Sequence, residues 1–563
     1  MSITVNFNRN WMPGFLDRFE KDGPWADQKL FNLSLIAEKH LLVPDFEGLV
    51  APKRLPELTP LPHQVDTASR VIEDMNGKAI LADEVGLGKT IEAGLVLKEY
   101  MIRGLVKRAL ILVPASLVSQ WTFELNSKFY IQAVAATKSY VWEQYDCVVS
   151  SIDTAKRSPH KEIIAEQEFD LIIIDEAHKL KNHKTKNYEF VQSLKKKFCL
   201  LLTATPIQNK IEEIFYLVSL LKPGHLGNQS SFLEKYKNKR LSVKENEHLK
   251  SLVNKVMIRN RRTDTGIEWT KRHVETIPID FNEQEKELYQ AFDFLRPSNV
   301  PMPAFSIMTL QREACSSREA VFFTLKNMLQ KENPSAQYIQ YIQLIQQKIN
   351  AVTRNSKAEK ALELIKKIDD KVIIFTEYRA TQLYLQWFLQ QQGIKSVPFR
   401  GGFKRSKKDW MRDLFMNQVQ VLIATEAGGE GINLQFCSHV INYDLPWNPM
   451  RLEQRIGRVH RLGQKEDVHI YNFAVKNTIE EHIVNLLTNK IKLFERVVGE
   501  LDDILAKLDG GSIEEHMMDI FKTSRTEGEM KVKMSNLAAM IEFSDMIRKE
   551  DAADASTGNP SIS

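Results

Sequence analysis

The amino-acid sequence predicts an α/β protein with two doubly wound lobes, each built on a parallel sheet, together with a helical insertion and a helical C-terminal flank. Short, continuously apolar runs alternate with helical patterns in two separate stretches, as expected for parallel sheets covered on both faces. The segment between these stretches has helical spacing and almost no strand signal. A chain of 563 residues is long enough for several such domains.

The first alternation follows a proline-rich segment, which blocks both helices and strand ladders and therefore marks a domain boundary. Residues 1–60 are predicted to form an accessory segment, and residues 61–225 the first lobe. The apolar runs that predict the strands of this lobe lie at 79–82, 109–113, 147–149, 171–174 and 199–202.

Residues 226–356 are predicted as a linker and helical insertion, because a structureless connection of this length would be improbable. The second lobe, 357–477, has its strand-like runs at 372–375, 396–399, 419–423, 440–443 and 468–473. In the flank, 478–563, helical spacing from Thr478 to Leu508 predicts one or two amphipathic helices that stop at Gly510-Gly511, followed by a disordered tail.

Composition narrows the class of protein but does not choose a partner. Lys and Arg total 77 against 72 Asp and Glu, a net charge of +5, and 43% of residues are hydrophobic, which excludes a disordered or fibrous chain. Four scattered cysteines without a CxxC pair argue against a zinc ribbon or disulfide framework. No apolar run reaches the ~18 residues of a membrane span. We therefore expect a cytoplasmic protein without a membrane partner.

The strongest local signal is Asp83-Glu-Val-Gly-Leu-Gly-Lys-Thr90, between a predicted strand and a predicted helix. Glycines allow backbone N–H groups to wrap a phosphate chain, and the helix N-terminus adds favourable partial charge. Lys89 would reach the β/γ-phosphates of ATP, and the Thr90 hydroxyl would bind Mg²⁺. The candidate nucleotide contacts are Asp83, Glu84, Val85, Gly86, Leu87, Gly88, Lys89 and Thr90. The alternative is a glycine-rich strand-to-helix turn.

A second signal places two carboxylates at the end of a strand. The run 171–174 leads directly into Asp175-Glu-Ala-His178, and this edge of a parallel sheet is where ligands bind. Asp175 would hold the Mg²⁺ shell with Thr90, partly through water, and Glu176 would polarise the attacking water. The alternative, a solvated acidic turn at a helix start, is less favoured because a phosphate loop precedes it.

The ordered motifs from Pro62 to Asn477 resemble the Swi/Snf-type branch of the superfamily-two helicases and ATPases, in its DEAH-box form. The resemblance implies two RecA-like lobes. Leu61-Pro-His-Gln64 is similar to the adenine-contacting motif, which makes Gln64 the expected base reader. Segment 112–121 resembles one that touches a nucleic-acid backbone, and segment 202–209 resembles the motif that couples hydrolysis to movement. The Asp83 form of the phosphate loop also fits this branch.

In the second lobe, segments 373–378, 424–434 and 454–464 fit the same family order. The resemblance implies that Arg458 and Arg461 reach across the cleft to the γ-phosphate and that Gln454 assists them. Arginine suits this task because its planar fork binds phosphate oxygens bidentately. The spacing of Arg455, Arg458 and Arg461 predicts one face of a helix, and a solvated arginine stripe is the alternative.

The resemblance also implies a partner, double-stranded DNA held without sequence preference. We expect contacts of the electrostatic, backbone-directed kind. The candidates are Ser116 and Gln120, the loop 426–433 with the N–H groups of Gly428, Gly429 and Gly431, the basic loop 400–408, and the cluster Arg259, Arg261, Arg262, Lys271 and Arg272. Solubility is the alternative role of each basic cluster.

Two details separate this chain from the family pattern. Glu426 and Glu430 make the loop of the second lobe more acidic. The phrase at 443–449 resembles bacterial members, including some that recycle RNA polymerase, so RNA polymerase or another DNA-bound protein is a candidate partner.

We expect an ATP hydrolase that translocates on duplex DNA. A strand-separating DNA or RNA helicase and a nucleotide-gated clamp on RNA polymerase are the alternatives, and the sequence leaves the oligomeric state open.

Overall fold

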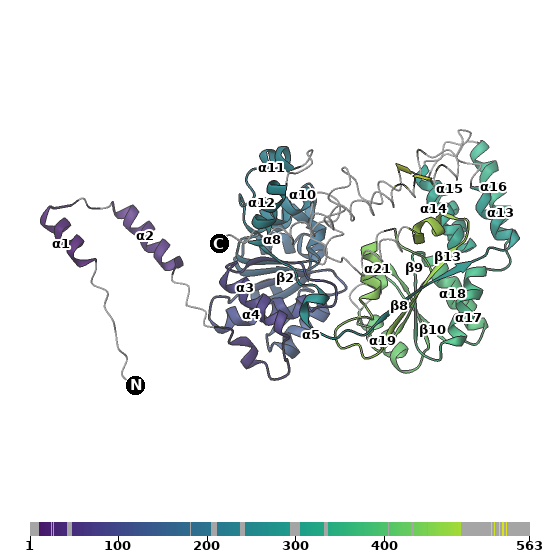
Figure 1. Ribbon diagram of the computed structural model, residues 1–563, viewed down its shortest axis with the longest axis horizontal. Helices are drawn as coiled ribbons and strands as arrows, with labels where there is room; N and C mark the ends of the chain where they lie inside the picture. Colours follow the sequence, from purple (N-terminus) through teal and green to yellow (C-terminus); the bar gives the residue numbers. More distant parts are fainter. Residues whose placement is uncertain are drawn as a thin grey trace, which may run out of the picture. The chain divides into compact units, whose positions relative to one another are not determined.

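The computed structural model describes residues 11–23, 25, 27–41, 48–180, 182–203, 211–236, 243–292, 304–331, 336–403, 405–429, 433–447 and 449–485, with a few positions between 519 and 536. The chain divides into two compact units, Met1–Leu49 and Val50–Ser563. The first contains α1 (Met12–Glu20) and α2 (Gln28–Leu41), shown in Figure 1. Within the described ranges, no helix combines the length and apolar character that a membrane crossing requires.

The second unit begins earlier than the predicted boundary at residue 60. The short helix η1 (Ala51–Arg54) packs on α4 (Lys89–Ile102). The N–H groups of Val50 and Ala51 donate to the buried carboxylate of Glu99, and Ala51 and Leu55 are themselves buried. This segment therefore belongs to the first lobe and not to the accessory unit.

The first lobe is a seven-stranded, fully parallel sheet in the order β3-β4-β2-β5-β6-β1-β7. Its strands are β1 (Lys78–Leu81), β2 (Ala109–Val113), β3 (Ala133–Ala135), β4 (Cys147–Ser151), β5 (Phe169–Ile174), β6 (Lys196–Leu202) and β7 (Met257–Ile258). The five predicted runs all fall on strands. The sequence did not predict β3 and β7, which are three and two residues long.

Helices lie between these strands along the chain, as expected for a doubly wound lobe. They are α3 (Pro62–Glu73), α4, α5 (Val118–Lys128), α6 (Val141–Gln144), α7 (Ile152–Ala155), α8 (His160–Ala165), η2 (Ala177–Leu180), α9 (Lys186–Ser193), α10 (Ile211–Leu221), α11 (Gln229–Tyr236) and α12 (Val243–Asn254). The short helix η3 (Arg262–Thr265) follows β7.

The second lobe is a six-stranded parallel sheet in the order β10-β11-β9-β12-β13-β8. Its strands are β8 (Arg272–Ile279), β9 (Val372–Thr376), β10 (Ser396–Phe399), β11 (Val421–Thr425), β12 (His439–Asn442) and β13 (Val468–Val475). The strand β8 comes from the predicted linker and pairs with β13 along all eight of its residues. It was not predicted, because it is an edge strand with most of its residues exposed and no apolar run. The fold class, two parallel α/β lobes, is confirmed.

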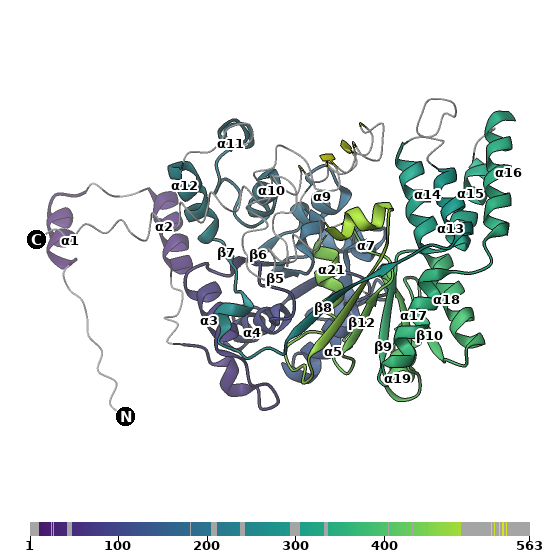
Figure 2. The same ribbon diagram turned by 45° about the vertical axis from the view of Figure 1, so that its right-hand side comes forward.

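The helical character predicted for the insertion is also found. Its helices are α13 (Glu283–Ala291), α14 (Ala304–Ser316), α15 (Arg318–Lys331) and α16 (Ala336–Ala351), which stand together in Figure 2. The second lobe continues with α17 (Ser356–Lys367), α18 (Arg379–Gln391), α19 (Arg405–Asn417), α20 (Glu426–Gly429) and α21 (Pro449–Ile456). Residues 479–485 are helical, and the remainder of the helix predicted to reach Leu508 lies outside the described residues.

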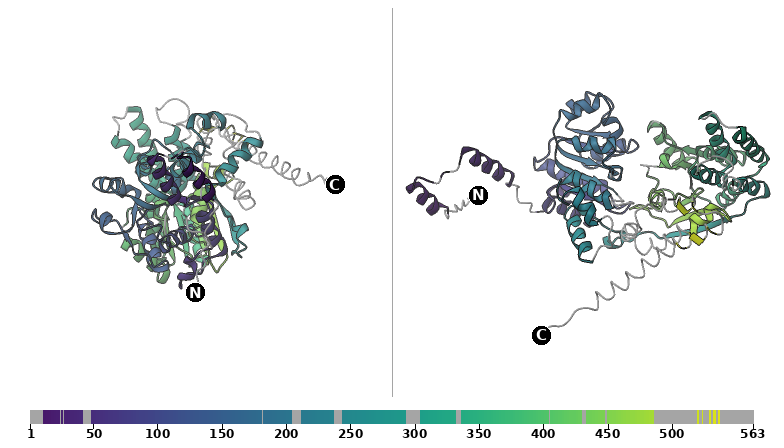
Figure 3. Two further views of the ribbon diagram at one scale, coloured as in Figure 1. Left: turned by 90° about the vertical axis from the view of Figure 1, so that its left-hand side faces the viewer. Right: turned by 90° about the horizontal axis from the view of Figure 1, so that it is seen from above.

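The insertion shares one hydrophobic core with the second lobe. Ile307, Leu310 and Ile342 of the insertion belong to the same buried cluster as Ile373 of β9. In the right-hand view of Figure 3, the teal-green insertion accordingly lies in the same body as the green second lobe. The first lobe has its own core, centred on residues such as Ile172 of β5.

Candidate active site

The segment between β1 and α4 forms a glycine-dependent loop. Gly86 and Gly88 have φ angles of 96° and 98°, in the left-handed region that glycine adopts at little cost. A Cβ on Gly88 would also collide with the amide nitrogen of Gln64. The loop leads into α4, and the N-terminus of a helix favours anions through its dipole. This geometry fits a phosphate chain.

Lys89 closes the loop on itself. Its Nζ donates to the backbone oxygens of Asp83 and Glu84 at 2.5 and 3.2 Å, and Thr90 follows it, half-buried, in the first turn of α4. Leu87 is fully buried and anchors the tip of the loop. Lys89 and Thr90 thus lie at the mouth of the loop, where phosphate and metal contacts were predicted.

Asp83 and Gln64 support the loop from behind. The buried Asp83 carboxylate accepts from the N–H of Asn260 at 2.8 Å and from its Nδ2 at 2.9 Å, which ties the loop to the residues after β7. Gln64 is buried at the start of α3 and donates from Nε2 to the backbone oxygen of Leu87 at 2.9 Å. Asn260 was not singled out from the sequence, because it lies 177 residues from Asp83.

The acidic pair follows β5 directly. The half-buried Asp175 carboxylate accepts from Trp121 Nε1 at 2.9 Å and from the Glu176 N–H at 2.8 Å. Glu176 itself has a φ of 53°, and His178 Nδ1 lies 3.2 Å from its Oε2. Trp121, at the end of the segment predicted to touch nucleic acid, therefore orients Asp175.

The pKa values of the two carboxylates are shifted in opposite directions. Burial and the charge of Glu176 raise the pKa of Asp175 above its usual range. Burial also disfavours ionisation of Glu176, but His178, Arg458 and Lys89 together hold the pKa of Glu176 below its ordinary value. A cation beside Asp175 would therefore relieve an unfavourable charge.

The donor set fits Mg²⁺ bound together with a nucleotide. Among the described residues, no group of three or more His, Cys, Asp or Glu side chains forms a metal cage. Mg²⁺ typically uses one or two carboxylates together with phosphate oxygens and water, and not an all-protein cage. Asp175 after β5 and Thr90 after β1 both follow carboxyl ends of strands in one parallel sheet.

The three predicted arginines do not share a helix face. The helix α21 ends at Ile456, so Gln454 and Arg455 lie within it, whereas Arg458 and Arg461 lie in the turns beyond. Arg455 is buried inside the second lobe and donates to the backbone oxygen of Asp444 at 2.6 Å. The helical prediction was wrong here because Gly457 ends the helical run.

The segment 457–461 lies on the phosphate loop. A Cβ on Gly457 would be 2.5 Å from Val85 Cγ1, and one on Gly86 would be 3.6 Å from Arg461 Cα. Burial and the charge of Arg458 lower the pKa of Arg461 to about 9, while Glu124, Asp175 and Glu176 act in the opposite direction. The structure therefore brings Arg458 and Arg461 into the electrostatic field of the acidic pair. Gln454 is half-buried on α21.

Two members of the predicted nucleic-acid cluster have a different role. Arg262 Nη2 donates to the backbone oxygen of Val85 at 2.7 Å, and its Nη1 lies 2.7 Å from His460 Nδ1. Arg272 pairs through Nη1 with the Glu453 carboxylate at 2.9 Å. Both guanidinium groups are engaged by partners within the protein, and their predicted contact with nucleic acid stays a prediction.

The loop of the second lobe also differs from expectation. Gly428 is buried, and a Cβ there would collide with the backbone of Phe399 and Arg400, so Gly428 serves close packing and not an exposed phosphate contact. Glu426 pairs with Arg451 Nε at 3.1 Å, which offsets its negative charge. The predicted contacts Glu430 and Gly431, and residues 204–209 of the coupling motif, lie outside the described residues.

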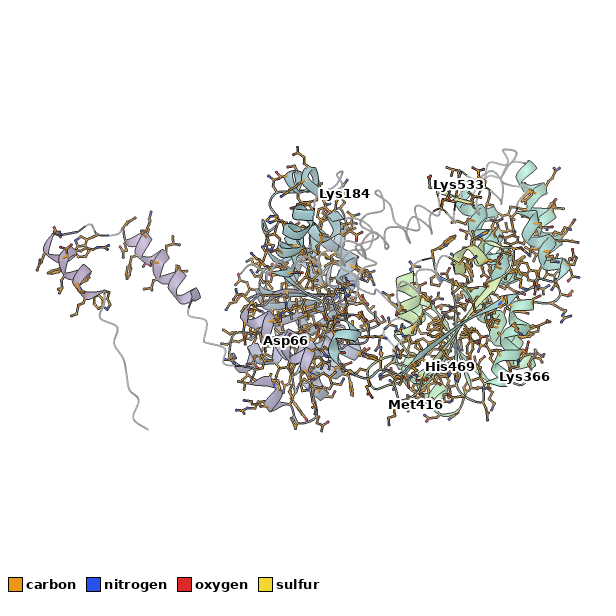
Figure 4. The ribbon with its side chains drawn as sticks, in the orientation of Figure 1. Asp66, Lys184, Lys366, Met416, His469 and Lys533 are labelled. Carbon is orange, nitrogen blue, oxygen red and sulfur yellow. The ribbon has the colours of Figure 1, made fainter. Side chains whose placement is uncertain are left out.

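A separate cavity of about 620 Å³ lies in the second lobe. It is lined by residues of α17, the turn before β9, and strands β8, β12 and β13, including Glu275, Lys360 and His439. His439 stacks on His469 with ring centroids 5.0 Å apart. Figure 4 labels His469, together with Lys366 of α17. None of the residues named above for the phosphate loop or the acidic pair lines this cavity.

Comparison with known proteins gives matches along most of the chain. The SNF2-related domain matches residues 63–354, and the helicase conserved C-terminal domain matches residues 356–463. The ATP-dependent helicase YqhH of Bacillus subtilis (strain 168), described as uncharacterized, is 65% identical over 553 residues, which cover 98% of this chain and 99% of that protein.

Solved structures of the SWI2/SNF2 ATPase core of Sulfolobus solfataricus are also similar. The match to the complex with dsDNA covers 84% of this chain and 97% of the Sulfolobus chain, with 23% identity and a TM-score of 0.39. The match to the core domain alone covers 80% of this chain and 92% of the Sulfolobus chain, with 23% identity and a TM-score of 0.37.

Proposed function

Because this chain belongs to the SNF2-related family of ATP-dependent helicases and is an ATP-hydrolysing enzyme, we propose that it couples hydrolysis to translocation on duplex DNA and thereby displaces or remodels DNA-bound protein. One observation carries the proposal. The segment with Arg458 and Arg461, from the second lobe, lies against the phosphate loop and the acidic pair of the first. A site completed by two lobes can link hydrolysis to their relative movement.

Each residue has a role in hydrolysis under this proposal. The loop N–H groups and Lys89 hold the phosphates, and Glu176 orients the attacking water. Asp175 and Thr90 hold Mg²⁺, which supplies neutralisation of the phosphate charge when bound. Arg458 and Arg461, assisted by Gln454, stabilise the charge that develops on the transferred group. Gln64 holds the loop at Leu87 and stays our candidate for contacting the base.

Movement follows from the same geometry. ATP contacted from both lobes favours their closure, and loss of the γ-phosphate removes part of that preference. If each lobe also holds the DNA backbone by charge, alternate closing and opening advances the protein along the duplex. The remaining candidates for that hold are the half-buried Ser116 and Gln120, the basic loop 400–408, and Arg259, Arg261 and Lys271, since Arg262 and Arg272 are engaged elsewhere.

The rate of ATP hydrolysis across a panel of nucleic acids tests the proposal. We expect duplex DNA of any sequence to raise the rate at least about tenfold, with the effect falling as salt increases. Glu176→Gln, which keeps the shape of the side chain, should remove turnover but retain ATP binding. Stimulation by single-stranded RNA alone would contradict the proposal.

We also propose that RNA polymerase or another DNA-bound protein is the partner that the motor acts on, in the bacterial cytosol. In the first compact unit, Trp11, Phe15 and Phe19 of the α1 region are all exposed, and exposed aromatic side chains suit a protein contact. A full chain with Trp11→Ala, Phe15→Ala and Phe19→Ala should retain DNA-stimulated hydrolysis but capture less RNA polymerase. Unchanged capture would contradict this contact.

A further inference from the structure

We propose that Arg262 is a positioning residue for ATP hydrolysis, which fastens the phosphate loop of the first lobe to the segment that carries Arg458 and Arg461. Nothing in the motif pattern of the chain assigns this role, because Arg262 lies between the lobes in a stretch that reads as a generic basic cluster. The inference rests on the proposed role of Arg458 and Arg461, and it specifies what fixes the segment that carries them.

The contacts of Arg262 reach both sides of the site. Its Nη2 donates to the backbone oxygen of Val85 in the phosphate loop at 2.7 Å and to the backbone oxygen of His460 at 3.2 Å. Its Nη1 lies 2.7 Å from His460 Nδ1. A single planar guanidinium thus joins the loop to the residue directly before Arg461. The planar fork of arginine is suited to such simultaneous contacts.

The surroundings of Arg262 fix its orientation. Its guanidinium lies over the ring of Trp269, with Cζ 4.4 Å from the centroid, and only 15% of the side chain is exposed. The Glu84 carboxylate lies 3.9 Å from Nε and also accepts from the backbone N–H of Arg262. A side chain held on these sides has little freedom to reach a nucleic-acid backbone.

His460 connects Arg262 to Arg272 on strand β8 of the second lobe. Its Nδ1 accepts from Arg262 and also from Arg272 Nε at 2.7 Å, so the proton of the neutral ring lies on Nε2, which donates to the backbone oxygen of Thr270 at 2.8 Å. Arg272 is held in turn by the Glu453 carboxylate on α21. The chain from Val85 through Arg262 and His460 to Glu453 therefore sets where the backbone of residue 460, and with it Arg461, lies.

Loss of Arg262 should affect the rate of the chemical step more than the binding of ATP. A displacement of about 1 Å in a catalytic group can cost about 10²-fold in rate. Loss of Arg262 leaves Lys89 and the loop glycines in place to bind ATP, but it frees the segment that carries Arg461. We therefore expect kcat to fall while KM for ATP stays nearly constant.

Steady-state hydrolysis by three full-length variants tests the proposal. Arg262→Ala and Arg262→Lys should each lower kcat at saturating ATP and duplex DNA by about 10- to 100-fold. Their KM for ATP and their DNA concentration for half-maximal stimulation should stay within about twofold of the original protein. Arg354→Ala, which removes a 72% exposed guanidinium paired with Glu359 on the helical side of the second lobe, is the control, with kcat within about twofold.

Lysine distinguishes position from charge. Arg262→Lys keeps the positive charge but lacks the planar guanidinium. A kcat of Arg262→Lys equal to that of the original protein would therefore overturn the proposal. It would also be overturned if Arg262→Ala raised the required DNA concentration and left kcat unchanged. If Arg262→Ala does not fold, Arg262→Lys with a retained thermal midpoint carries the comparison.

A double-mutant cycle supplies a second readout. Arg262→Ala and His460→Ala remove the same link, so the combined loss should be smaller than the sum of the two single losses in ΔΔG‡. Additive losses would contradict the link. If the original protein shows no stimulation by DNA, the proposed function fails, but the variants can still be compared on unstimulated hydrolysis, where the same ordering is expected.

Discussion

At the scale of single residues, the site depends on side chains that reach it through the topology of the fold. Lys89, Asp175 and Glu176 could be predicted because phosphate loops and acidic strand ends have local patterns. Trp121 and Asn260 could not, because each acts on a residue far away in the chain. Their roles exist only once the carboxyl ends of the strands meet at one edge.

Gly457 provides a direct test of the contact between the lobes. Gly457→Ala places a Cβ 2.5 Å from Val85 Cγ1, so we expect kcat to fall by about tenfold or more as the segment is pushed from the loop. Val85→Ala removes that Cγ1 and leaves the closest loop atom, the Val85 Cβ, 3.4 Å away. Hydrolysis rates should therefore be partly restored in the double variant. A double variant as slow as Gly457→Ala would contradict the contact.

Trp121 should matter through one hydrogen bond. Trp121→Phe keeps a buried ring but removes the donor to Asp175, and hydrogen bonds to charged groups contribute about 1.5–3 kcal/mol. We expect kcat to fall about 10- to 100-fold, together with a greater Mg²⁺ requirement. Trp142→Phe, which removes a bond to His160 elsewhere in the same lobe, is the control. Equal effects of the two substitutions would exclude a specific role for Trp121.

At the scale of elements, burial explains which predictions succeeded. Central strands such as β2 are continuously apolar and were predicted. The edge strand β8 was not predicted, because the residues in its middle are exposed. The end of α21 before Arg458 was also missed, since a three-residue spacing of arginines is compatible with a helix that the backbone does not continue.

One buried ion cluster joins three elements of the second lobe. Lys357 at the start of α17 is 1% exposed, with Nζ 2.6 Å from Glu480 and 3.5 Å from Asp444. Lys357→Met would remove the cation from these two buried carboxylates, and breaking a buried ion pair costs about 3–5 kcal/mol. Lys360→Met on the same helix removes an exposed pair and should change stability by less than about 1 kcal/mol. Equal denaturation midpoints for the two variants would contradict the prediction.

The histidine that Arg262 contacts should make stability depend on pH. Burial, Arg272 and Arg262 lower the pKa of His460 to about 3, below its usual value of about 6.5 in an unfolded chain. The folded state then binds fewer protons than the unfolded state between these values, so stability should fall as the pH drops through this window. His460→Asn keeps an acceptor but does not titrate. Its thermal midpoint should fall less between pH 7.5 and pH 5, and an equal fall would contradict this assignment.

At the scale of the whole molecule, the candidate ATP site is composed of parts from both lobes, with Arg262 and Gly457 at their contact. The net charge of +5 gave no indication of a partner because charges are used locally. Several arginines, including Arg262, Arg272 and Arg455, are engaged inside the protein and are not part of a basic surface. The insertion shares the core of the second lobe, so we expect the two to move together.

The central claim, that hydrolysis drives movement along duplex DNA, is tested most directly by displacement of the third strand from a DNA triplex. We predict that the full-length protein with ATP releases the third strand, while Glu176→Gln does not, and that the strands of a forked duplex stay paired under the same conditions. Separation of the fork while the triplex stays intact would contradict the account. So would an intact triplex in the presence of strong duplex-stimulated hydrolysis.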